Sequence, residues 1–89
     1  MNVLSFEKGR KYYPSTCPIC AGSALEADIV PRQAEFQCAC CGAYEITSAA
    51  RSAMKGMSQE HRALWLLQTR QRASDRLHIA LVACANEPH

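Results

Sequence analysis

Two pairs of cysteines with the spacing Cys-x-x-Cys are the residues of this chain whose type and position could do chemistry. The first pair is Cys17 and Cys20, and the second is Cys38 and Cys41, which Gly42 follows directly. A Cys-x-x-Cys turn bends the backbone so that both sulfurs point to one ion, and two such turns separated by a segment of hairpin length supply four thiolates. The sequence therefore predicts a structural Zn²⁺ site with ligands Cys17, Cys20, Cys38 and Cys41.

The other candidate metal ligands fit this site less well. Cys40 also lies in the second turn, but pairing Cys38 with Cys41 keeps the two-residue spacing and places a glycine directly after the second ligand. We therefore interpret Cys40 as a bystander. Cys84 lies in an apolar stretch and is interpreted as a small buried hydrophobic residue. The three histidines, at positions 61, 78 and 89, are not spaced to complete the site.

No residues of this chain form a recognisable catalytic set. Four thiolates saturate a zinc ion, whereas a catalytic zinc keeps an open position for water. A redox role for Cys-x-x-Cys would need a thioredoxin-like βαβ setting, which the sequence lacks. There is also no glycine-rich phosphate loop and no recognisable Ser-His-Asp arrangement. We therefore expect a protein that is not an enzyme.

Length and composition predict one small domain. The chain has 89 residues, 48% of them hydrophobic, so its core is modest and a metal is a useful addition to it. The six cysteines could instead form disulfides, but residues 1–8 are too short and too polar for a secretory signal. We therefore expect a reducing, cytoplasmic location, where this spacing favours metal. No run approaches the roughly 18 apolar residues that span a bilayer, so no membrane association is expected.

Period-two patterns predict strands between and after the two turns. Residues 25–30 alternate apolar and acidic side chains, Pro31 interrupts the run, and residues 34–37 resume it before Cys38. This pattern is typical of a hairpin. Residues 43–47 are rich in β-forming residues and predict a third short strand that pairs with the hairpin.

Helix signals dominate the C-terminal half. Ser48 is a candidate N-cap and Gly56 a candidate stop, which predicts a short helix between them. Ser58 is a second N-cap candidate, for a helix over residues 59–73. A third helix is expected over residues 76–85. Residues 77–82 could also form a strand, but the alanine-rich composition favours helix.

The turns and strands together resemble the zinc-ribbon group, in which a Cys-Pro-x-Cys-Gly turn, a β-hairpin and a second Cys-x-x-Cys-Gly turn lead into a further strand. Here the first glycine, Gly22, comes one residue late, whereas the second turn matches closely. The resemblance implies a small α+β fold: a zinc-ribbon hairpin plus a third short strand, followed by two or three helices. We expect an N-terminal arm at 1–11, a four-cysteine zinc ribbon at 12–47, and a helical region at 48–89 packed on the ribbon.

Positive charge is concentrated in the C-terminal half. Residues 1–47 carry four Lys or Arg against five Asp or Glu, whereas residues 48–89 carry six against three. On the second helix Ala63, Leu64 and Leu67 share one face, at about 100° per residue. Trp65 falls on another face with two arginines, and Arg76 would join them if the helix continued. The predicted partner-binding residues are Arg62, Trp65, Arg72 and Arg76. The alternative is that Trp65 is buried and the arginines are solvated.

These features favour two kinds of function. The first is a non-enzymatic zinc-ribbon module that binds a protein partner, for example a small regulator or inhibitor from a phage or mobile element. The alternative is a transcription regulator that binds nucleic acid directly, with arginines on phosphates. These arginines are Arg51, Arg62, Arg70, Arg72 and Arg76. The apolar segment 77–85 exceeds what one ribbon can cover and could pack against a second copy, forming a homo-oligomer.

Overall fold

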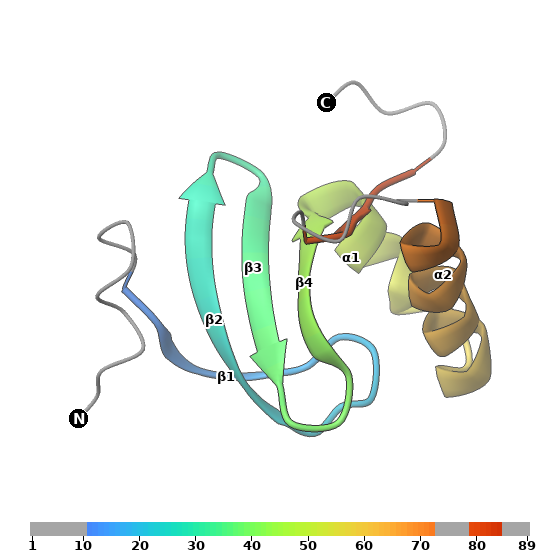
Figure 1. The fold of residues 1–89 in the computed structure, drawn as a ribbon, viewed down its shortest axis with the longest axis horizontal. Coiled ribbons are helices and arrows are strands. Elements are labelled where there is room, and N and C mark those ends of the chain that lie inside the picture. Colours follow the sequence, from blue (N-terminus) through green and yellow to red (C-terminus); the bar gives the residue numbers. More distant parts are fainter. Residues whose placement is uncertain (1–10, 73–78, 85–89) are drawn as a thin grey trace.

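The computed structural model describes residues 11–72 and 79–84. The elements in chain order are β1 (Tyr13–Thr16), β2 (Ser23–Val30), β3 (Gln33–Cys38), β4 (Gly42–Thr47), α1 (Ser48–Met54), α2 (Gln59–Arg72) and β5 (Leu81–Val82). The five strands form one sheet in the order β1-β2-β3-β4-β5 (Figure 1). Strands β1 to β4 are antiparallel to their neighbours, whereas β5 pairs parallel to β4.

The two cysteine turns lie at the same end of the sheet. The first turn connects β1 to β2 and the second connects β3 to β4. Because β2 and β3 form an antiparallel hairpin, with Ala24 opposite Cys38, the hairpin returns the chain to the end where the first turn lies. The predicted hairpin and third strand correspond to β2, β3 and β4.

The core lies on the face of the sheet that α1 covers. The register places Glu26, Phe36 and Tyr44 in one row across β2, β3 and β4. The rings of Phe36 and Tyr44 stack with centroids 5.7 Å apart. Met54 of α1 and Leu66 of α2 complete this buried cluster.

Hydroxyl side chains cap the N-termini of both helices. Thr47 is the N-cap of α1, and its side chain accepts a hydrogen bond from the amide of Ala50. The prediction of Ser48 as N-cap was therefore wrong by one residue. Ser58 accepts from the amide of His61, as expected of the residue that caps α2.

The predicted fold class was wrong about the elements after the hairpin. The sheet has five strands, and the described residues contain two helices. Residues 81 and 82 form β5, where a third helix was expected. Val82 is fully buried and lies opposite Ile46 of β4, so pairing with the free edge of β4 outweighs the weak local preference for helix. Of the predicted third helix at 76–85, only residues 79–84 belong to the described part of the chain.

Two further expectations, the N-terminal arm and the lack of a membrane-spanning segment, can be compared only with the described residues. The predicted arm at 1–11 falls outside them except for Lys11. Among the residues that the structure describes, no helix has the length and apolar character needed to cross a membrane.

Candidate metal centre

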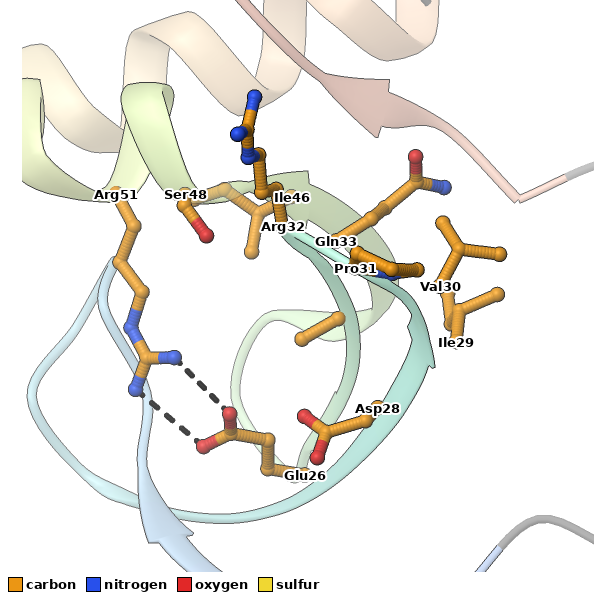
Figure 2. Close-up of a pocket in the computed structure, with 11 residues that line it drawn as sticks. Glu26, Asp28, Ile29, Val30, Pro31, Arg32, Gln33, Ile46, Ser48 and Arg51 are labelled. Atoms are coloured by element: carbon orange, nitrogen blue, oxygen red, sulfur yellow. Dashed lines mark hydrogen bonds and ion pairs between the residues drawn. The ribbon is translucent and has the colours of Figure 1, made fainter.

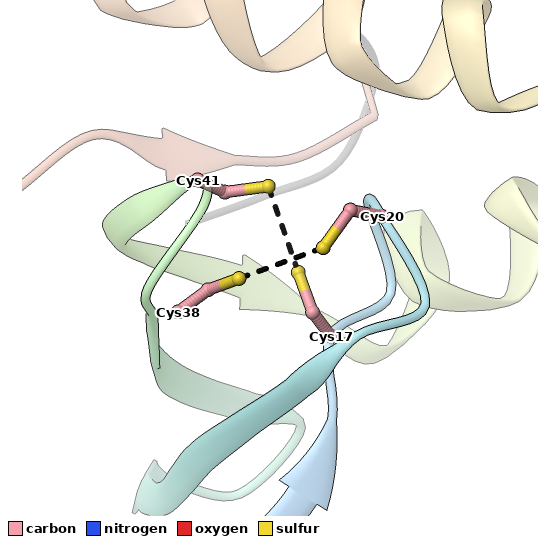
Figure 3. A group of neighbouring side chains, drawn as sticks. All are labelled: Cys17, Cys20, Cys38 and Cys41. Atoms are coloured by element: carbon pink, nitrogen blue, oxygen red, sulfur yellow. Dashed lines mark hydrogen bonds between the residues drawn. The ribbon is translucent and has the colours of Figure 1, made fainter.

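The four cysteines of the two turns bring their sulfurs together. All four Sγ atoms lie within 4.8 Å of one another. Two contacts join one turn to the other: Cys17 to Cys41 at 3.8 Å and Cys20 to Cys38 at 3.5 Å (Figure 3). Cys17 and Cys38 are buried, and Cys20 and Cys41 are half-buried. The cluster can hold a metal ion with four sulfur ligands.

The first turn is closed by its own backbone. The amide of Ala21 donates to the carbonyl of Cys17, and the amide of Cys17 donates to the carbonyl of Gly22, both at 2.8 Å. The amide of Gly22 points to the Cys20 sulfur at 3.4 Å. Ala21 has φ = 66°, a left-handed conformation that glycine adopts more readily. The zinc-ribbon pattern has its glycine at this position.

Ala21→Gly is expected to stabilise the protein by about 0.5–1 kcal/mol. Left-handed backbone costs a non-glycine residue roughly 1–2 kcal/mol, and the greater freedom of glycine in the unfolded chain offsets part of that gain. Urea unfolding of the metal-loaded protein measures the change. The control is Ala53→Gly in α1, expected to destabilise by about 0.5–1 kcal/mol. Equal losses from both substitutions would contradict the argument.

The second turn supplies amide donors to its first cysteine. Burial alone would raise the pKa of the Cys38 thiol. Hydrogen bonds from the amides of Cys41 and Cys40 outweigh burial, and the net pKa falls to about 7. A thiolate is therefore accessible near neutral pH, as a metal ligand requires. Gly42, at φ = +83°, completes the turn in a conformation that suits glycine. Cys40 is exposed and lies outside the sulfur cluster.

Tyr44 contacts the cluster from within the core. Its hydroxyl lies 3.0 Å from the Cys17 sulfur, and its side chain is fully buried. Burial raises the pKa of Tyr44, and the neighbouring Cys17 raises it further, so the hydroxyl keeps its proton. A protonated hydroxyl can donate to a metal-bound thiolate, which orients the ligand.

Tyr44→Phe is expected to weaken metal binding about 10- to 100-fold, the usual range for loss of a group that hydrogen-bonds to a ligand. The ring and its stacking on Phe36 remain, so the fold should persist. Competition with a chromophoric chelator measures the affinity. Tyr13→Phe is the matched control, because that hydroxyl contacts Asp28 instead. Equal affinities for the two variants would argue against the role of Tyr44.

Arginines of α2 bind the backbone of both turns. Arg62 Nε donates to the carbonyl of Ile19 at 3.0 Å, and its Nη1 donates to that of Met57 at 2.6 Å. Arg70 Nη2 donates to the carbonyls of Cys41, at 2.6 Å, and Ala43, at 3.1 Å. These two arginines attach α2 to the metal centre.

The predicted partner-binding residues do not form one exposed surface in the described residues. Arg62 is half-buried and bonded to the backbone. Trp65 is half-buried and packs against the core cluster, whereas Arg72 is exposed at the end of α2. Arg76 lies outside the described residues. The partner-binding role of these residues remains a prediction.

A polar hollow of about 470 Å³ lies between the β2–β3 hairpin and α1 (Figure 2). Arg51 forms an ion pair with Glu26 there, Nη1 to Oε2 at 2.9 Å, and Ser15 donates to Glu26 at 2.6 Å. Burial raises the pKa of Glu26, but Arg51 and Ser15 outweigh it, so the net pKa is lowered. Arg51 also lies 4.9 Å from the centroid of Phe36. The Glu26 carboxylate therefore stays ionised, and the Arg51 guanidinium balances its charge within the fold.

Arg51→Met is expected to destabilise the protein by about 1–3 kcal/mol, because it leaves a buried charge without its main partner. Adding Glu26→Gln should recover part of that loss, since the uncompensated charge is then removed. Chemical denaturation of both single variants and the double variant measures the coupling. Additive effects of the two substitutions would show that the ion pair contributes nothing.

The sequence analysis missed several residues that support the centre. These are Tyr44, Arg70, Ala21 and the Glu26–Arg51 pair. A local signal existed for Arg70, because Arg62, Leu66 and Arg70 recur every four residues and thus lie on one row of α2. Leu66 is the buried member of that row.

Comparisons of the chain with family models, with curated proteins and with solved structures gave no match in any of the three. The assignment of the centre therefore depends on the geometry described above.

Proposed function

We propose that this protein is a non-enzymatic module in which a structural Zn²⁺ holds a small domain that binds a protein partner. The observation that carries the proposal is the cluster of four sulfurs. Sulfurs about 2.3 Å from a tetrahedral zinc lie about 3.8 Å apart. The contacts between the turns, 3.5 Å and 3.8 Å, fit that distance.

The ligand set favours a structural zinc over a catalytic one. All four positions around the ion would be taken by cysteine, which leaves no position for water or substrate. The amide of Gly22 and the hydroxyl of Tyr44 are placed to donate to the sulfurs. Such donors reduce the charge on the thiolates and hold them in place.

Contacts of the arginines favour a protein partner over direct nucleic-acid binding. Of the five arginines considered for phosphate binding, Arg51 pairs with Glu26, and Arg62 and Arg70 bind backbone carbonyls. A guanidinium that is already bonded within the fold is less available to a phosphate.

A second hollow, of about 270 Å³, suits a segment of a protein. It lies between the first cysteine turn and α1, and its lining includes the apolar side chains of Pro18 and Met54. The exposed Lys55 also lines it, and no carboxylate is among its lining residues. Arg51 and Arg62 line it too, but their guanidinium groups are already bonded within the fold. An apolar side chain with acidic neighbours would complement this surface.

Elemental analysis and binding assays test the proposal. We expect one zinc per chain after purification in reducing buffer. Fluorescence anisotropy with duplex and single-stranded oligonucleotides at 50 mM salt should show no binding. Binding that weakens steeply with salt would support the nucleic-acid alternative. A partner captured by the wild-type protein should be lost with Lys55→Glu and retained with Thr69→Ser, which keeps the hydroxyl of α2.

A further inference from the structure

The outer face of α2 carries a short apolar seam. Leu64 and Leu67 are 47% and 51% exposed. They lie between Glu60 and Gln71, which are also exposed. The spacing of these four residues is four, three and four, the alternation that keeps side chains in line on a helix. We name Glu60, Leu64, Leu67 and Gln71 the α2 seam.

The α2 seam points away from the rest of the described chain. The opposite side of the helix makes the intramolecular contacts, through Arg62 and Leu66. Figure 1 shows α2 at the edge of the molecule, on the far side of the sheet from β1. The seam is therefore accessible to another molecule along its whole length.

We propose that the α2 seam is a homodimer interface, in which two α2 helices pack antiparallel about a two-fold axis. An axis midway between Leu64 and Leu67 sets Leu64 of one copy opposite Leu67 of the other. The same axis sets Glu60 opposite Gln71 at each end. The seam is thus complementary to itself, as a two-fold interface requires. This inference is independent of the protein partner proposed above.

Charge selects the antiparallel orientation. The first turn of α2 carries Glu60, and the last turn carries Arg70 and Arg72. Antiparallel packing places the acidic end of each helix beside the basic end of the other, and it also opposes the helix dipoles. Parallel packing would instead set Glu60 against its own copy. The residues flanking the seam add no repulsion, since Ala63 faces Arg70 and His61 faces Gln68.

The interface is short, so the dimer should be weak. About three turns of helix bury less than the roughly 1,200 Å² typical of stable complexes. We therefore expect a dissociation constant of about 0.1–1 mM for the dimer. Sedimentation equilibrium of the zinc-loaded full chain between 10 µM and 1 mM measures it. The expected result is a rise in average mass toward the dimer, and a monomer at 1 mM would overturn the proposal.

Two sets of variants test the interface itself. The double substitution Leu64→Gln/Leu67→Gln should give a monomer at 1 mM, whereas Val30→Gln should not, although Val30 is equally exposed, at 51%, at the end of β2. Gln71→Lys should strengthen association at least threefold, because it sets an ammonium group opposite Glu60 of the other copy, whereas Gln71→Glu should weaken association at least threefold. Unchanged association in the leucine variant, or equal association of the two Gln71 variants, would overturn the antiparallel interface. Retained zinc and circular dichroism show that each variant is folded.

Discussion

Cys17→Ser is expected to abolish the cooperative fold of this protein. Serine is a poor ligand for a soft metal, and Cys17 is a buried member of the sulfur cluster. Structural zinc contributes roughly 10–16 kcal/mol of apparent binding free energy in small zinc domains, whereas whole proteins are stable by only about 5–15 kcal/mol. Loss of the metal should therefore leave both cysteine turns open and the sheet unfolded.

Circular dichroism and dispersion of amide NMR signals measure this loss. The same unfolding should follow when a strong chelator is added to the wild-type protein, and added Zn²⁺ should reverse it. The matched control is Cys40→Ser, in the same turn but exposed and outside the cluster, which should leave the fold and the metal content unchanged. A folded, cooperative Cys17→Ser protein would show that the metal is dispensable for folding.

The cluster of four cysteines was predictable because its signal is local. The two-residue spacing within each pair determines that the sulfurs of Cys17 and Cys20, and those of Cys38 and Cys41, point the same way. The hairpin between the pairs follows from alternation and from the break at Pro31. Each step uses residues close in the sequence, and the register of β2 and β3 then brings the pairs together.

Contacts between distant residues were not predictable in the same way. Alternation indicates that Tyr44 and Ile46 share a face, but it does not show that the Tyr44 hydroxyl reaches Cys17, 27 residues away. Likewise, Glu26 sits in an alternating strand where a solvent-facing carboxylate is the usual expectation. It is buried because Arg51 of α1 covers it.

The C-terminal half shows how tertiary contacts override local preference. A two-residue strand such as β5 has no stability alone, and only the unpaired edge of β4 makes strand better than helix there. In α2 the apolar residues Leu64 and Leu67 face outward, while Arg62 turns inward. Polar backbone groups at the first cysteine turn and at the end of α1 require donors, and a long guanidinium can satisfy several of them.

Arg62→Ala should destabilise the protein by about 2–4 kcal/mol, the second largest effect expected of a single substitution here. The Arg62 side chain donates to three backbone carbonyls: those of Ile19, Met54 and Met57. Removing the charged donor loses those three bonds, although the Met54 carbonyl keeps its bond from the amide of Met57. Arg62→Lys should recover little, since an ammonium cannot span the three carbonyls as the planar guanidinium does. Thermal and urea unfolding of the metal-loaded variants measure the change.

Arg72→Ala is the matched control, because Arg72 lies on the same helix but is exposed. It should change the stability by no more than about 0.5 kcal/mol.

Metal release separates a specific role of Arg62 from general destabilisation. Arg62 binds the carbonyl of Ile19 inside the first cysteine turn. Arg62→Ala should therefore release zinc to a chelator faster than a core variant such as Leu66→Ala, when urea is used to bring the two variants to equal stability. If the two variants release zinc at the same rate, Arg62 supports α2 but not the metal centre. If Arg62→Ala is as stable as Arg72→Ala, the attachment of α2 to the turns contributes nothing to the fold.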